Sequence, residues 1–178
     1  TRNNTEYGRF VTEKLVEDMQ ALHVLVVSGL AYGIDACAHK AAIYNQLPTV
    51  GVLAHGLDTI YPVQHKNLAK EIIQSAGGLL TEFPRNTKPD KHNFPKRNRI
   101  VAGMCDATIV VETPAKGGSM ITAELASNYN RDVFAFPGKI TDSKSTGCNY
   151  LIKKNMAQLL ESAEDVATAL RWSREDGQ

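Results

Sequence analysis

The residues best suited to chemistry in this sequence lie within 94–126. Three cations stand at the start of a helix expected there: Lys96, Arg97 and Arg99. An apolar run at 107–111 predicts a buried strand, and a Gly117-Gly118-Ser119 turn, with Lys116 beside it, leads into a further helix. A parallel strand that runs into a glycine turn and a helix directs free N–H groups and a positive dipole end at one point. This arrangement favours phosphate as a ligand.

A second glycine turn, at Ser28 and Gly29, follows another expected strand. Two interpretations are open: a tight strand-to-helix turn with Asp35 in the first helical turn, or a turn whose N–H groups hold phosphate. The glycines at 29 and 33 do not have the GxGxxG spacing of dinucleotide-binding turns. The sequence also lacks GxxxxGK[ST] and GxSxG, which disfavours Walker-type nucleotide hydrolases and serine hydrolases.

The basic segment has a physical cost that bears on its role. Cations at a helix N-terminus oppose the helix dipole, at about 0.3–1 kcal/mol each when exposed. Lys96, Arg97 and Arg99 follow Lys91 closely, and together they are best explained by an anion that occupies the site. The alternative is an ordinary solvated helix start.

Composition limits the class of protein. With 178 residues, 43% of them hydrophobic, the chain fits one domain with a substantial core. Its formal net charge is only +1, but residues 85–99 hold six cations and one anion, so the positive charge is local. Three cysteines without CxxC spacing argue against a disulfide framework or a zinc site and favour a reducing cytoplasm. No apolar run has membrane-spanning length, and no signal peptide is recognisable.

Strand and helix patterns alternate along the chain. Strands are expected at 23–28, 49–54, 79–83, 107–111 and 132–136, and helices at 5–21, 34–46, 65–76, from 95, from 119, at 149–156 and at 162–171. This alternation predicts an α/β fold, a doubly wound and mostly parallel sheet with helices on both faces. Residues 1–171 would form the domain, and 172–178 a tail or linker. Ligands of such sheets bind at the carboxyl ends of the strands, where the glycine turns lie.

Some polar and aromatic residues in these turns have two interpretations. Tyr61 is suited to stacking on a nucleobase, but an aromatic residue before Pro62 serves equally to wedge a loop. His55 is ambiguous. His39, on the second expected helix, is better explained as a packed or capping side chain than as a ligand.

Several motifs together indicate a family. SGLAYGIDACAH, GLDTIYP, FPKRNRIVAG, GGSMITAELA and GCNYLI occur in the order typical of the DNA-processing DprA (Smf) proteins, and the chain resembles that family from residue 1 to about 170. The resemblance implies a Rossmann-like domain without catalytic activity, metal or cofactor. It implies a cytoplasmic homodimer that binds single-stranded DNA in natural transformation and helps to load RecA.

The resemblance also assigns residues. The implied DNA-binding set is Arg2, Ser28, Gly29, Lys66, Lys91, Lys96, Arg97, Arg99, Lys116, Gly117, Gly118 and Ser119. The implied dimer face, near a C-terminal helix, is Tyr150, Ile152, Met156 and Leu159, whose spacing fits a plain core equally well. The strand that precedes Thr1 in the family is absent from this sequence.

An enzymatic alternative comes from the lysine-decarboxylase-like phosphoribohydrolases, which release free base from nucleoside monophosphates. GGSMITAE, residues 117–124, resembles their PGGxGTxxE turn, although the leading proline is missing and Thr122 is displaced by one residue. The candidate catalytic acid would be Glu112 or Glu124. A third alternative, a scaffold for partner proteins, leaves the basic segment unexplained.

Overall fold

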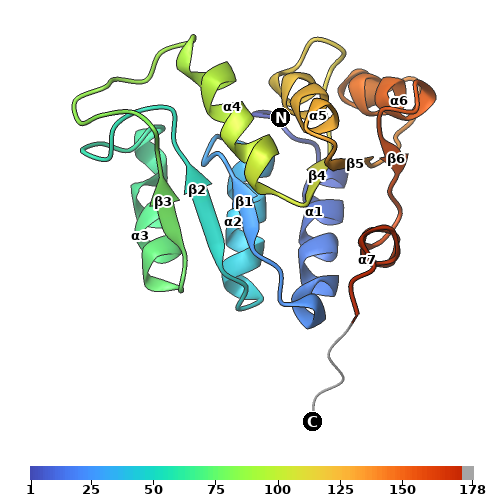
Figure 1. Ribbon diagram of the computed structural model, residues 1–178, viewed down its shortest axis with the longest axis horizontal. Coiled ribbons are helices and arrows are strands. Elements are labelled where there is room, and N and C mark those ends of the chain that lie inside the picture. The colour runs from blue at the N-terminus through green and yellow to red at the C-terminus, as the bar shows by residue number, and fades with distance from the viewer. Residues whose placement is uncertain (174–178) are drawn as a thin grey trace.

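The computed structural model describes residues 1–173 (Figure 1). The helices are α1 (Glu6–Asp18), α2 (Ile34–Tyr44), α3 (Lys66–Gln74), α4 (Asn93–Met104), α5 (Gly118–Asn128), α6 (Thr146–Lys153) and α7 (Ala163–Leu170). The strands are β1 (Val26–Ser28), β2 (Thr49–Val52), β3 (Gly78–Leu80), β4 (Ala107–Val110), β5 (Asp132–Ala135) and β6 (Gln158–Leu159). The predicted α/β alternation is confirmed. The two-residue β6 was not predicted, because two exposed residues carry no periodic signal.

The strands form two parallel three-stranded sheets, in the orders β1-β2-β3 and β4-β5-β6. Figure 1 shows the sheets side by side, with the strands across the molecule in the order β3, β2, β1, β4, β5, β6. This is the strand order of the classical doubly wound nucleotide-binding fold, in which the order of successive strands reverses between the two halves. Among the described residues, no backbone ladder joins β1 to β4.

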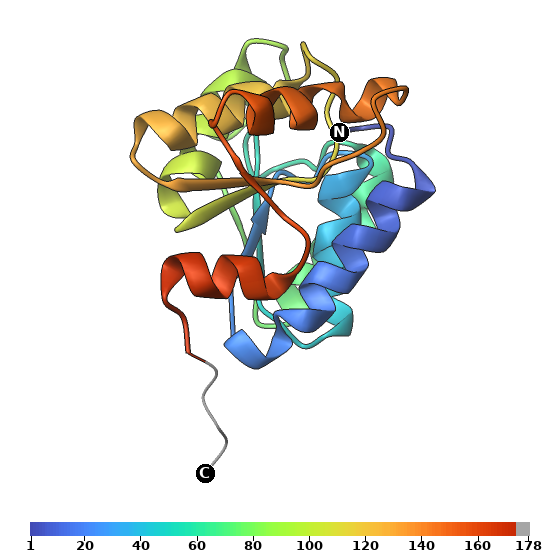
Figure 2. The ribbon, with the colours of Figure 1, turned by 90° about the vertical axis from the view of Figure 1, so that its right-hand side faces the viewer.

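Helices cover both faces of the sheets, as Figure 2 shows from the side. Helix α2 packs against α1 and α3 on one face, and α4 packs against α5 on the other. Helix α1 begins where the sequence predicts: Thr5 is its N-cap, and the Thr5 side chain accepts a hydrogen bond from the backbone N of Gly8.

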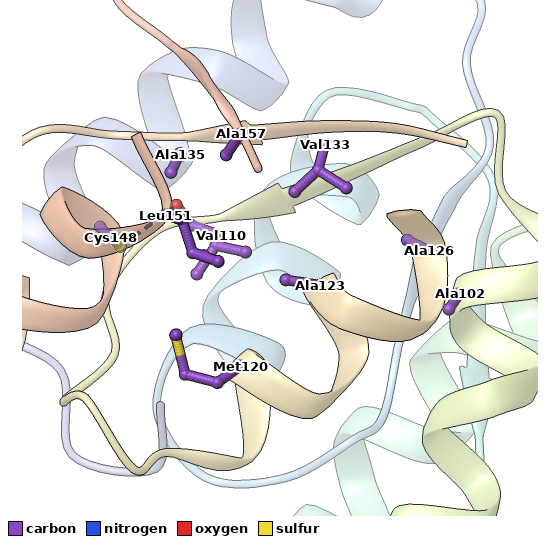
Figure 3. Packing of buried hydrophobic residues seen from close by; sticks show 10 residues of the cluster. All are labelled: Ala102, Val110, Met120, Ala123, Ala126, Val133, Ala135, Cys148, Leu151 and Ala157. Carbon is purple, nitrogen blue, oxygen red and sulfur yellow. Dashed lines mark hydrogen bonds between the residues drawn. The ribbon is translucent and has the colours of Figure 1, made fainter. Parts of the chain in front are cut away.

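The core is divided among the helix–sheet contacts. The cluster under α5 consists largely of small side chains, which let the helix lie close to β4 and β5 (Figure 3). On the opposite face, α1 and α7 pack against Phe134 and Phe136. Trp172, predicted to begin a tail or linker, packs against this second cluster, and residues 174–178 of that predicted tail lie outside the described residues. No helix within residues 1–173 is both long and apolar enough to cross a membrane.

Candidate nucleic-acid interface

A cleft lies at the carboxyl ends of β1 and β2, where the fold class places ligands. The turn after β1, the loop after β2 and the first turn of α4 line it. Its cationic side chains are Arg2 and Arg97, and its aromatic side chains are Tyr32, Tyr61 and Phe94. The cleft therefore offers both positive charge and ring surfaces.

Arg97 is the residue that joins the walls of this cleft. Its side chain is buried, with an exposed fraction of 6% for the residue. Nη1 donates to the carbonyl oxygens of Gly29 and Val52, at 2.8 and 2.7 Å, and Nε donates to Asn98 Oδ1 at 3.0 Å. Burial lowers the pKa of Arg97, whereas Asp35 raises it. The sequence predicted Arg97 as a phosphate ligand; its Nη1 group holds the ends of β1 and β2 together, and its part in phosphate binding stays a prediction.

The backbone N–H groups of the turn after β1 form hydrogen bonds within the protein. The backbone N atoms of Gly29 and Ala31 donate to Asp35 Oδ2, at 3.1 and 3.3 Å. Burial by itself raises the pKa of Asp35. The charge of Arg97 and smaller contributions from neighbouring groups lower it by more, so the net pKa of Asp35 is lowered. The protein's own carboxylate therefore accepts from two N–H groups of this turn, which favours the tight-turn interpretation, and phosphate binding at Ser28 and Gly29 stays a prediction.

The left-handed conformation of Leu30 shapes the same turn. Leu30 is fully buried at φ +58°, which is unusual for a bulky residue. Its backbone N donates to Nε2 of His39 at 3.3 Å, and Nδ1 of His39 lies 2.7 Å from Thr49 Oγ1. Burial lowers the pKa of His39 to about 4. His39 is thus a packed, neutral histidine, as predicted.

The remaining predicted cations differ in how freely they can meet a ligand. Lys66, Lys91 and Lys96 are exposed, whereas Arg99 forms an ion pair with Glu82. Arg2 is held near the cleft because the carbonyl of Thr1 accepts from Ile34 N at 3.0 Å, and its guanidinium lies 4.8 Å from the centroid of Phe94.

The turn at residues 116–119 belongs to the other half of the molecule. It follows β4, Gly117 is the N-cap of α5 without a side-chain cap, and Lys116 is exposed. A Cβ on Gly117 would lie 2.1 Å from Thr113 Oγ1, so this turn requires glycine. The residues that line the cleft do not include 116–119. This turn therefore does not line the cleft, and its convergence with the basic segment on one ligand stays a prediction.

Glu112, the alternative catalytic acid, faces the interior. Its exposed fraction is 1%, and its carboxylate accepts from the backbone N of Thr5 at 2.9 Å and from the Thr5 hydroxyl. A carboxylate at the start of α1 stabilises the helix dipole. Glu124 is exposed on α5, beyond its first turn. Glu112 is thus buried and bonded to the start of α1, whereas the Glu124 residue is exposed.

The predicted dimer residues divide into two pairs. Ile152 and Met156 pack against the core cluster beneath α5. Tyr150 and Leu159 are exposed, at 47% and 43%. Only Tyr150 and Ile152 lie on α6, because the helix ends at Lys153 and Leu159 lies in β6. Within residues 1–173 no group of three His, Cys, Asp or Glu side chains is arranged to hold a metal ion.

Comparison with known proteins gives a consistent picture. Residues 1–171 match the family model described as DNA recombination-mediator protein A. The chain is 38% identical to Protein Smf of Escherichia coli K12 over 97% of its own length and 46% of that protein. It is 41% identical to the DNA processing protein DprA of Streptococcus pneumoniae, over 93% of its own length and 58% of the relative. The chain thus spans about half the length of these curated relatives.

Two solved structures share the fold closely. The crystal structure of S. pneumoniae DprA matches with a TM-score of 0.87 at 39% identity, over 94% of this chain and 58% of that one. The structure of DNA processing protein A from Helicobacter pylori, which describes a single-stranded DNA binding mode, matches with a TM-score of 0.82 at 31% identity. That match covers 96% of this chain and 77% of the other.

Proposed function

Since the chain belongs to the DNA recombination-mediator protein A (DprA/Smf) family, we propose that it is a single-stranded DNA-binding module that acts without catalysis. The observation that carries this proposal is the cleft at the carboxyl ends of β1 and β2. It combines Arg2 and Arg97 with three aromatic rings. Exposed Lys91 and Lys96 are close in sequence to its lining residues Phe94 and Arg97. Single-stranded DNA presents both phosphates and unstacked bases, and this cleft complements both.

In this proposal, phosphate contacts supply most of the affinity. Lys91, Lys96, Lys66 and Arg2 are the exposed cations that neutralise successive phosphates and release their counterions. Arg97 contributes its charge from the lining of the cleft while it holds the walls together. Bases stack on the aromatic rings, which accept any base because every base has a π-face. Binding is therefore tolerant of sequence.

The biological process in which this chain acts is proposed from its family. We propose action in natural transformation and loading of RecA in the cytoplasm, which the family description as a recombination mediator supports. The free thiols of Cys37, Cys105 and Cys148 suit a reducing compartment. We also propose a homodimer, which exposed Tyr150 and Leu159 support. Two linked sites on one DNA strand would raise its affinity through effective concentration.

The decisive test is fluorescence anisotropy of labelled single- and double-stranded oligonucleotides across a salt series. The variant is Lys91→Ala/Lys96→Ala, and the control is Lys40→Ala/Lys153→Ala, which removes two exposed charges from α2 and α6. Each lost phosphate contact reduces the slope of log K against log salt by about 0.7 for single strands, so the test variant should lose about 1.4. The control should retain the wild-type slope.

Arg97 is left intact in this test because its removal would also leave two carbonyls without their donor. Equal slopes for the wild type and Lys91→Ala/Lys96→Ala would contradict the assignment of these lysines. A protein that binds neither oligonucleotide would refute the proposed function. Release of free base from a nucleoside monophosphate would instead support the phosphoribohydrolase alternative.

A further inference from the structure

Three histidines support the walls of the cleft through its backbone. His39 accepts from the backbone N of Leu30, and Nδ1 of His65 lies 2.7 Å from the carbonyl oxygen of Leu30. The third, His55, contacts the backbone of Tyr61. Leu30 lies between Gly29 and Ala31, which line the cleft, whereas Tyr61 carries one of its rings. His55 is therefore the histidine bonded to the segment that carries a ring suited to stacking on a nucleobase.

The hydrogen bonds of His55 specify one form of its ring. The residue is buried, with an exposed fraction of 1%. Nδ1 lies 2.8 Å from the carbonyl oxygen of Gly56, which only accepts, so Nδ1 carries the proton. Nε2 lies 3.2 Å from the backbone N of Tyr61, which only donates, so Nε2 is the acceptor. A neutral imidazole protonated at Nδ1 satisfies both contacts.

Tyr61 is well placed for ring contact with a ligand. It is 44% exposed and lines the cleft with Phe94. The two ring centroids are 6.1 Å apart with planes tilted by 50°, and the Arg2 guanidinium lies 4.8 Å from the Phe94 centroid. The rings therefore do not stack flat on each other, and the exposed face of Tyr61 remains accessible.

We propose that His55 is a positioning residue for nucleobase stacking: through the Tyr61 backbone it sets the place of the Tyr61 ring in the cleft. This inference rests on the proposed function, because the ligand is an unpaired base of single-stranded DNA. His55 lines the cleft but is only 1% exposed, so we expect it to act on the base through Tyr61. It fixes the peptide from which the stacking ring projects, so that less conformational freedom is lost when the base binds.

Two substitutions separate positioning from simple space filling. In His55→Gln, the side-chain carbonyl reaches the place of Nε2 and can accept from Tyr61 N. In His55→Asn, the shorter side chain reaches only the place of Nδ1, so the contact with Gly56 is retained and the contact with Tyr61 is lost. Both replacements are polar amides, which makes them a matched pair. Positioning predicts that Gln rescues and Asn does not.

The experiment measures the base contribution to affinity directly. Anisotropy compares oligothymidine with an abasic oligonucleotide of equal phosphate number, for the wild type, His55→Gln and His55→Asn, each with and without Tyr61→Ala. A stacked base contributes about 5- to 150-fold in affinity. We expect His55→Asn to lower the oligothymidine-to-abasic affinity ratio at least about 5-fold and His55→Gln to stay within about 2-fold of the wild type. Abasic affinity and salt slope should not change.

The Tyr61→Ala background tests the route of the effect. If His55 acts through the Tyr61 ring, His55→Asn lowers the ratio no further once that ring is gone, which is the coupling expected of two residues in one unit. Equal ratios for wild type and His55→Asn would overturn the inference while the proposed function stands. An equal loss in both His55 variants that includes abasic binding would also overturn it, since that result indicates packing alone. A wild type that does not bind single strands would refute the proposed function, and the inference with it.

Discussion

Replacement of Gly29 by alanine is the most direct test of how the cleft is held together. A Cβ at this position would lie 2.5 Å from Arg97 Nη1, 2.7 Å from Arg97 Cζ and 2.8 Å from Asp35 Oδ2. Arginine ends are normally flexible. This one is fixed, because Nη1 donates to two carbonyl oxygens inside the protein. The alanine methyl group therefore requires Arg97 to leave its position.

The cost of that displacement can be estimated from the contacts. Two hydrogen bonds from a charged donor are lost, at about 1.5–3 kcal/mol each. The half-buried Asp35 carboxylate also loses the charge that does most to lower its pKa. We expect Gly29→Ala to lower the free energy of unfolding by about 3–6 kcal/mol, the sum for the two lost hydrogen bonds.

Urea unfolding followed by circular dichroism measures this change, with Gly78→Ala as the control. A Cβ on Gly78 meets nothing within 4 Å, so that variant should lie within about 1 kcal/mol of the wild type. A double variant with Arg97→Met tests the route, because Gly29→Ala should cost much less once the guanidinium is absent. Equal free energies of unfolding for Gly29→Ala and Gly78→Ala would refute the role assigned to Arg97.

Two further predictions concern titration. The pKa of His39 is about 4 in the folded protein and 6.5 in the unfolded chain. Between these two pH values only the unfolded chain binds the proton. Through this residue, the free energy of unfolding should therefore rise by about 1.4 kcal/mol per pH unit from pH 4 to 6.5. Urea titrations across that range should show a shallower rise in His39→Gln and no change in exposed His23→Gln, and an unchanged slope in His39→Gln would contradict the assignment. Burial raises the pKa of Cys148 to about 12 and that of Cys105 to about 11, so iodoacetamide at pH 8 should label both thiols far more slowly in the folded protein than in urea. Mass spectrometry of the labelled peptides checks this, and equal rates in the two states would show that these thiols are not protected.

Local pattern was sufficient for the α-helices of the fold and for every described strand except β6. A short continuous apolar run such as 107–111 predicts a buried strand. That signal lies within a few neighbouring residues. The N-cap at Thr5 and the packed role of His39 were predicted for the same reason. The order of strands and glycine turns also located the edge of the sheet where the cleft lies.

The roles of the buried charges were decided only by the tertiary structure. Arg97 bonds to carbonyls 68 and 45 residues away, and Glu112 bonds to Thr5, 107 residues away. Asp35 accepts hydrogen bonds from N–H groups that, judged from the sequence alone, were equally suited to hold phosphate. A charge removed from water must find partners in the surrounding structure. The sequence of this protein thus determined where its cations and turns lie, and the packing of distant segments determined which of them remain free for a ligand.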